Sequence, residues 1–157
     1  MSRGSIGASD QASIGAARGW LRAAPLVLLT VVLPLERAGR EWIVDAMGCP
    51  AGRLRDEVCL RALLECIVDE LSLRAVEPPL FHVFGGEGGM TALVLLAESH
   101  LAVHTFPELG IATFNLYCCR PRPDWPWAER LADALDAARV TVRVLDRGDE
   151  YAGEGAP

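Results

Sequence analysis

The segment that most constrains the fold is an unbroken apolar run, Ala92-Leu93-Val94-Leu95-Leu96-Ala97, which follows Thr91. A short run of this kind is typical of a buried strand in the middle of a sheet. The run leads directly into the polar pair Glu98-Ser99. We therefore expect a central strand with Glu98-Ser99 at its end.

Other strand-like segments lie on both sides of this run. They are residues 41–47, which contain Trp42-Ile43-Val44 and end at Gly48; residues 80–84, which follow Pro78-Pro79; residues 111–119, which follow Gly110; and a final stretch in which Val140, Val142 and Val144 alternate with Thr141, Arg143 and Leu145. The glycine-rich residues 85–89 predict a turn.

Two segments have the apolar spacing of helices. The first begins near Asp56 and places Leu60, Leu63, Leu64, Ile67 and Leu71 on one face; the second follows Pro121 and Pro123 and places Trp127, Leu131, Ala134 and Leu135 on one face. Asp124 is the expected N-cap of the second helix.

The resulting order, β, α, β, β, β, β, α, β, predicts an α/β (α+β) fold. We expect a two-layer sandwich in which two helices cover one face of a mostly antiparallel sheet. The uncovered face must remain polar or find another partner. This need motivates the hypothesis of a dimer.

The predicted domain spans residues 41–148 of the 157-residue chain, between an N-terminal extension, 1–40, and a tail, 149–157. The extension begins with a Gly-, Ser- and Ala-rich stretch that we expect to be partly disordered. Its apolar run 23–35 is shorter than the roughly 20 residues that span a bilayer. We read it as an edge segment or upstream extension, with secretion as the minor alternative.

Charge and composition exclude two classes of function. A net charge of -6 argues against a nucleic-acid binder, because that binding depends on concentrated positive charge. All 15 basic residues counted as Lys and Arg are arginine, so no lysine can hold pyridoxal phosphate. An enzyme that stabilises a carbanion beside an amine would then need a different carbonyl group as its electron acceptor, and its own backbone could supply one.

The chain contains five cysteines without a CxxC pair, which makes a disulfide framework improbable.

The candidate reactive residues lie in the motif Glu98-Ser99-His100-Leu101-Ala102-Val103-His104-Thr105-Phe106-Pro107-Glu108. Attack by the Ser99 hydroxyl on the Glu98 carbonyl would form an ester, with His104 nearby in sequence to move protons. β-Elimination and hydrolysis would then leave an N-terminal pyruvoyl group. The products would be chains 1–98 and 99–157.

Strand geometry complicates this assignment. On a regular strand, His100 and His104 share one face while Ser99 points to the other, so a bend or bulge is needed to bring Ser99 and His104 together. The two histidines could instead be surface residues or half of a zinc site. With His82 as the one remaining histidine, we expect no metal.

The motif resembles the self-cleavage site of the small bacterial, pyruvoyl-dependent S-adenosylmethionine decarboxylases, whose pattern is ESHxxxHT(W)PE. The resemblance extends over most of residues 41–148 and includes Val44-Asp45-Ala46, Gly48-Cys49, Cys119 and Arg147-Gly148. It implies a cytoplasmic proenzyme that is cleaved between 98 and 99 and makes the aminopropyl donor for spermidine. It also implies a homodimer of αβ units, S-adenosylmethionine as substrate and neither membrane nor nucleic acid as partner.

The same resemblance implies roles for individual residues. Ser99 becomes the pyruvoyl group, which forms a Schiff base with the substrate amine. His104, Glu98 and Thr91 support self-cleavage, and Thr91 stands where serine is usual in the family. Cys119 returns a proton to the α-carbon of the substrate. The residues implied to bind the substrate are Glu108, Phe106, Phe84 and His100. Of these, Glu108 could form hydrogen bonds with two ribose hydroxyls.

Two departures from the family pattern leave alternatives open. Asn115 stands where an acidic residue is usual, and Cys118-Cys119-Arg120 replaces threonine-cysteine-glycine. The first alternative is a pyruvoyl-dependent arginine or ornithine decarboxylase on the same scaffold. The second is an uncleaved, non-catalytic regulatory homologue, against which the pairing of Ser99 with Cys119 argues.

Overall fold

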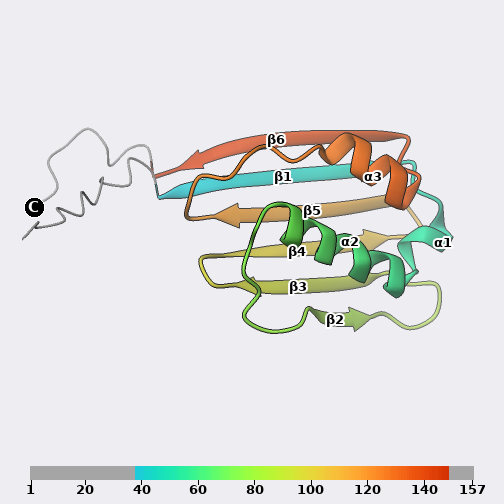
Figure 1. Ribbon diagram of the computed structural model, residues 1–157. Helices are drawn as coiled ribbons and strands as arrows, with labels where there is room; N and C mark the ends of the chain where they lie inside the picture. The colour runs from blue at the N-terminus through green and yellow to red at the C-terminus, as the bar shows by residue number, and fades with distance from the viewer. Residues whose placement is uncertain (1–37, 149–157) are drawn as a thin grey trace, which may run out of the picture. The chain divides into compact units, whose positions relative to one another are not determined.

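A computed structural model describes residues 38–148 (Figure 1). The predicted tail, 149–157, and residues 1–37 of the predicted extension lie outside these residues, whereas Gly39 and Arg40 of that extension already belong to the first strand. The described segment contains one six-stranded sheet in the order β2-β3-β4-β5-β1-β6, with every neighbouring pair antiparallel. The strands are β1 (Gly39–Met47), β2 (Leu80–Val83), β3 (Met90–Leu96), β4 (Ser99–Phe106), β5 (Ile111–Cys118) and β6 (Arg139–Arg147).

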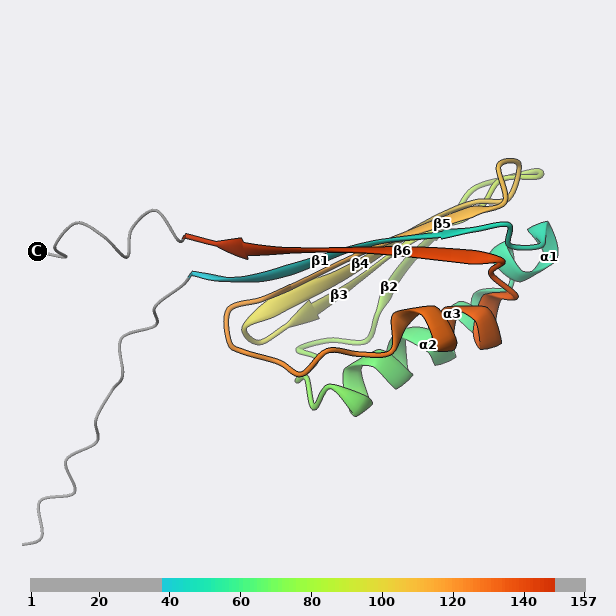
Figure 2. The same cartoon turned by 90° about the horizontal axis from the view of Figure 1, so that it is seen from above.

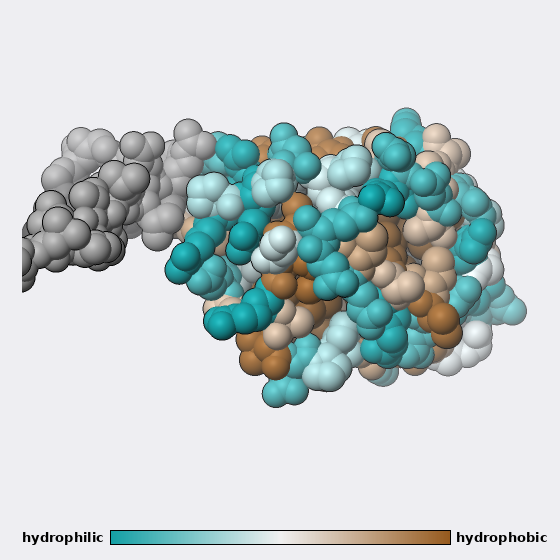
Figure 3. Space-filling view, viewed as in Figure 1, coloured by the Kyte–Doolittle hydropathy of each residue, from teal (hydrophilic) through white to brown (hydrophobic). Residues whose placement is uncertain are grey.

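The two longer helices, α2 (Glu57–Glu70) and α3 (Trp127–Leu135), lie on one face of this sheet, and the short α1 (Ala51–Leu54) lies at its end, as Figure 2 shows. The core lies between the two layers and contains alternate residues of the central strands, among them Val44, Val94, Val103 and Phe114. Figure 3 views the helical layer from outside, where hydrophilic residues surround smaller hydrophobic areas. The predicted two-layer α+β sandwich is confirmed.

The helix boundaries agree with the sequence prediction at one helix and differ at the other. Asp56 is the N-cap of α2, where its carboxylate accepts a hydrogen bond of 3.0 Å from the Cys59 N–H. At α3 the N-cap is Pro126, so the expected cap at Asp124 was wrong. Trp125 and Trp127 are buried in edge contact, with ring centroids 4.8 Å apart, and this packing sets where the helix begins.

Strand β3, which contains the apolar run, lies second from the edge of the sheet rather than at its centre, and it is buried less completely than its composition predicts. Met90, Ala92, Val94 and Leu96 face the helices and are buried, whereas Leu93 and Leu95 are 41% and 53% exposed on the opposite face. Among residues 38–148, no helix lies on this side of the sheet, and we refer to it as the open face. Its exposed leucines leave the apolar run without cover on one side.

Strand β4 pairs residue for residue with both neighbours along its length. Its partners run from Ser99↔Cys118 to Phe106↔Ile111 in β5 and from Ser99↔Leu96 to His104↔Thr91 in β3. The bend or bulge expected between Ser99 and His104 is therefore replaced by regular pairing. In the described segment, no helix is long and apolar enough to cross a membrane.

Candidate active site

The Glu98–Ser99 peptide bond lies where the β3–β4 hairpin turns. Ala97 and Glu98 form the turn, and Ser99 is the first residue of β4. The backbone N–H of Cys119 donates a hydrogen bond of 3.2 Å to the Glu98 carbonyl oxygen. Any negative charge that developed on this oxygen would therefore meet a donor already in place.

The Ser99 side chain belongs to the helix-side face of β4, which it shares with the buried Leu101 and Val103. It lies beside the buried Cys118 thiol. Burial raises the pKa of this thiol, and smaller opposing effects come from hydrogen bonding to Ser99 and from the nearby Arg122. Cys118 is consequently a neutral, packed neighbour of the serine.

A cavity of about 190 Å³ opens beside the same bond. Its described lining residues are Ser72, Leu73, Arg74, Leu96, Ala97, Glu98, Ser99 and Arg122. The Ala97 N–H donates to the Arg74 carbonyl oxygen at 2.9 Å, which holds the segment after α2 against the hairpin. The scissile bond predicted from the sequence thus lies in the wall of a small cavity with basic side chains.

Cys119 is half-buried and immediately follows β5. The neighbouring Tyr117 has a raised pKa, first because of burial and then because of its contact with Cys119. Tyr117 also stacks on His100, with ring centroids 5.8 Å apart. Sequence reasoning missed Tyr117, although its place two residues before Cys119 on a strand could have indicated it.

A second group of predicted site residues lies on the open face, toward the far end of β4. Thr91 and His104 are cross-strand partners, and the threonine Oγ1 lies 2.9 Å from His104 Nδ1. Phe84, Phe106 and Glu108 line a neighbouring cavity of about 420 Å³. The structure therefore brings together the aromatic and acidic residues expected to bind substrate.

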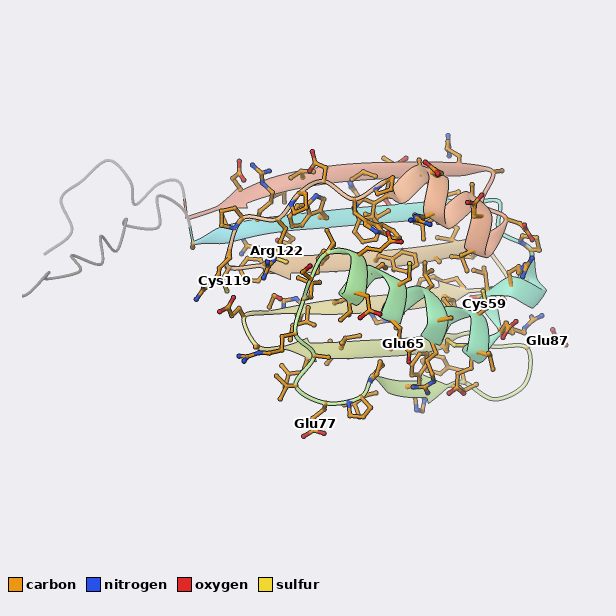
Figure 4. All side chains as sticks on the ribbon, viewed as in Figure 1. Cys59, Glu65, Glu77, Glu87, Cys119 and Arg122 are labelled. Atoms are coloured by element: carbon orange, nitrogen blue, oxygen red, sulfur yellow. The ribbon has the colours of Figure 1, made fainter. Side chains whose placement is uncertain are left out.

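The two groups lie at opposite ends of the sheet. Figure 4 shows Cys119 and Arg122 together at one end and Glu87, which lines the larger cavity, at the other. His104 lies five positions after Ser99 on a regular strand, about 16 Å away at 3.3 Å per residue, and the two side chains project from opposite faces. One copy of the described segment does not bring these two residues together.

Asn115 lies on the open face beside a carboxylate from a neighbouring strand. Its Nδ2 donates to Glu41 Oε1 at 2.7 Å, and the same carboxylate pairs with Arg147. The Asn115 hydrogen bond is the largest of several effects that lower the pKa of Glu41. A carboxylate from β1 therefore lies beside position 115, a neighbour that only the strand register reveals.

All five cysteines fall within the described residues and are free thiols. Within residues 38–148, no group of three or more His, Cys, Asp and Glu side chains is placed to hold a metal ion. His82 instead contacts Phe84 edge-on, with ring centroids 4.7 Å apart.

Comparisons with known proteins identify the family. The family model described as S-adenosylmethionine decarboxylase matches residues 40–148. An S-adenosylmethionine decarboxylase proenzyme of Caldicellulosiruptor saccharolyticus is 34% identical over 118 residues, covering 73% of this chain and 91% of the relative. S-adenosylmethionine decarboxylase proenzyme 2 of Halalkalibacterium halodurans is 33% identical, with 73% and 89% coverage.

A relative with a different name is equally similar. The arginine decarboxylase proenzyme of Aeropyrum pernix is 34% identical over 113 residues, covering 71% of this chain and 86% of the relative. The extent of these matches, together with the geometry around Glu98-Ser99, places the chain in the S-adenosylmethionine decarboxylase family.

Proposed function

We propose that the chain is a proenzyme that cleaves itself between Glu98 and Ser99 and then decarboxylates S-adenosylmethionine for spermidine synthesis. The observation that carries this proposal is the Cys119 N–H donating to the Glu98 carbonyl at 3.2 Å. It places a hydrogen-bond donor on the scissile carbonyl and the predicted proton donor beside the same bond.

The cleavage begins with attack of Ser99 Oγ on the Glu98 carbonyl carbon. The negative charge that forms on the carbonyl oxygen is stabilised by the Cys119 N–H, and an ester replaces the peptide bond. Loss of the Ser99 α-proton and of the Glu98 carboxylate leaves dehydroalanine. Tautomerisation, addition of water and release of ammonia give a pyruvoyl group at residue 99, with chains 1–98 and 99–157.

The residues present fit such a group, because Ser99 lies in the wall of a cavity and the Cys119 backbone is hydrogen-bonded to Glu98, the residue before it. A pyruvoyl carbonyl condenses with the amine of an α-amino acid and withdraws electrons as carbon dioxide leaves. Cys119, half-buried and carrying a free thiol, would then donate a proton to the substrate α-carbon.

The larger cavity has the chemistry that an adenosyl group requires. The aromatic rings of Phe84 and Phe106 offer surfaces on which an adenine could stack, and the Glu108 carboxylate could accept hydrogen bonds from two ribose hydroxyls. His100 would lie nearer the pyruvoyl end, beside Tyr117. These contacts favour S-adenosylmethionine over a simple amino acid.

The separation of the two groups supports a homodimer with composite sites. In an isologous dimer, two open faces packed in antiparallel sense would place the Thr91–His104 end of one copy beside the Ser99 end of the other. His104 could then serve proton transfer at the partner's Ser99 once the start of β4 turns this serine, whose side chain lies on the helix-side face of the intact chain, toward the open face. The exposed Leu93 and Leu95 provide apolar area for this contact.

A basic amino acid is the second candidate substrate. The relative from Aeropyrum pernix is an arginine decarboxylase proenzyme, and Glu41 lies beside Asn115 on the same open face as the predicted substrate residues. A carboxylate there could receive a guanidinium or ammonium group.

Two variants and a substrate screen test the proposal. Ser99→Ala should block both cleavage and turnover, whereas Cys119→Ala keeps the backbone N–H and should cleave while releasing carbon dioxide much more slowly. More labelled carbon dioxide should be released from carboxyl-labelled S-adenosylmethionine than from carboxyl-labelled arginine or ornithine. Cleavage of the Ser99→Ala chain at this bond would show that the nucleophile is wrong, and folded wild-type protein without any decarboxylase activity would favour a regulatory homologue.

A further inference from the structure

Three arginines surround the Glu98–Ser99 bond. Arg120 Nε pairs with the Glu98 side chain, with 2.9 Å between Nε and Oε2. Arg74 and Arg122 line the 190 Å³ cavity together with Glu98 and Ser99. Of the described residues lining this cavity, Glu98 alone carries a carboxylate. The intact peptide bond therefore lies in a surplus of positive charge.

Arg122 has unused hydrogen-bonding capacity in this cavity. Its Nε is buried and, among the described residues and their contacts, lacks a hydrogen-bond partner. A buried donor without a partner costs stability. A guanidinium group is also the side chain best shaped to bind a carboxylate through two parallel hydrogen bonds. The unused donor is therefore available to an anion that the described residues do not supply before cleavage.

The local sequence limits the conformations of both arginines in the loop after β5. Arg120 precedes Pro121, and Arg122 precedes Pro123. A residue before proline is confined largely to extended backbone conformations, and each proline has a fixed φ. The Arg-Pro-Arg-Pro segment therefore presents its two guanidinium groups with little loss of backbone entropy when an anion binds.

We propose that Arg122, assisted by Arg74, receives the α-carboxylate that self-cleavage creates at Glu98. This inference rests on the proposed function. In the ester, the Glu98 carbonyl carbon is bonded to Ser99 Oγ; elimination transfers that bonding electron pair to the oxygen and releases a carboxylate, while the Ser99 α-proton goes to a base. The new anion forms in the wall of the cavity that Arg122 and Arg74 also line.

Two consequences follow from this placement. A guanidinium group that binds the departing carboxylate stabilises the leaving group, so it favours conversion of the ester to dehydroalanine. After cleavage, the same contact holds the new end of chain 1–98 beside residue 99. Arg120 remains paired with the Glu98 side chain and fixes the orientation of that residue.

The test compares Arg122→Gln in two backgrounds, wild type and the uncleavable Ser99→Ala. In the cleaved protein, we expect Arg122→Gln to lower the thermal midpoint by about 5 °C, because a carboxylate loses its partner. In Ser99→Ala the peptide is neutral there and Arg122 has no carboxylate to lose, so the midpoint should not fall. Arg53→Gln is the matched control, since Arg53 pairs with Asp136 elsewhere on the surface and should behave alike in both backgrounds.

Cleavage is followed by intact mass with and without hydroxylamine, which splits esters. Slower elimination in Arg122→Gln should appear as a full-length chain that hydroxylamine cuts after Glu98. Full-length chain that resists hydroxylamine, an equal loss of stability in both backgrounds, or no loss in either would overturn the inference. Failure of the wild-type chain to cleave would instead overturn the proposed function, so the two failures are distinguishable.

Discussion

At the scale of single residues, strand register decides which side chains surround the reactive serine. Ser99 is paired with Cys118, and Glu98 accepts a hydrogen bond from Cys119, so two adjacent cysteines have different surroundings. Cys118 is 2% exposed and packed among core residues, whereas Cys119 is half-buried at the end of β5. The sequence places the two thiols side by side, but only the fold distinguishes them.

This difference predicts the order in which the thiols react. Alkylation requires an accessible thiolate, and burial both covers Cys118 and raises the pKa of its thiol. We expect iodoacetamide to modify Cys119 well before Cys118 in folded protein, as measured by peptide mass after timed quenching. Equal rates in folded protein would contradict the placement of Cys118 in the core.

Glu41 predicts a specific dependence of stability on pH. Its pKa is lowered in the folded state, mainly by the hydrogen bond from Asn115. A lowered pKa means that the ionised carboxylate stabilises the fold above the unfolded-state pKa, near 4.5, and that this contribution is lost as pH falls through the lower folded-state pKa.

This effect is tested by measuring the thermal midpoints of wild type and Glu41→Gln at a series of pH values. The series should run from about pH 3 to about pH 7, a range that includes the usual carboxylate pKa. The variant should be less stable at neutral pH and should approach wild type at the acidic end. Asp69→Asn is the comparison, since Asp69 is an exposed carboxylate on α2. A constant difference across the pH range would contradict the proposed linkage.

At the scale of elements, the order and type of the long strands and helices follow from apolar patterns. The short helix α1 could not be predicted, because four residues contain barely one turn of periodicity. The N-cap of α3 was misplaced because packing of Trp125 and Trp127, rather than a side-chain cap, sets its start. Ser99 and Cys119 could be chosen from motif spacing, whereas Tyr117, Glu41 and the arginine-lined cavity depend on strand register and loop packing.

Thr105 connects three of these elements. Its buried Oγ1 accepts a hydrogen bond of 2.9 Å from the Met90 N–H of β3 and donates one of 2.8 Å to the Leu54 carbonyl of α1. The threonine of the sequence motif therefore has a structural role, next to the predicted catalytic residues.

Thr105→Val should keep the shape of the side chain and lose both hydrogen bonds. Two buried backbone groups would then lack partners, and we expect a loss of about 2 kcal/mol or more in the free energy of unfolding. Urea unfolding measures the loss, with Thr113→Val on the open face as control. A change below roughly 0.5 kcal/mol, the usual limit for surface substitutions, would contradict the structural role.

At the scale of the whole molecule, the exposed leucines of the open face and the separation of the predicted site residues into two groups both support a homodimer. The apolar run of β3 lacks cover on that face, and the two groups of predicted site residues lie too far apart to cooperate within one copy. A symmetric dimer would cover the leucines and complete the site with the same contact.

Mixed dimers test whether the site is composite. Neither Ser99→Ala nor His104→Ala should be active alone. Coexpressed in equal amounts, they should give about a quarter of the wild-type activity, because half of the dimers are mixed and each contains one complete site. Ser99→Ala coexpressed with Ser99→Ala,His104→Ala is the negative control. Absence of any rescue in demonstrably mixed dimers would show that His104 does not act across the interface.

The central claim is that this chain makes its own electron-withdrawing carbonyl at residue 99, and the intact mass of the denatured, purified protein tests it most directly. We predict two polypeptides, residues 1–98 and residues 99–157, the second with a pyruvoyl group in place of its N-terminal serine. A single full-length mass from folded wild-type protein, or a second fragment that begins with an unmodified serine, would contradict the claim.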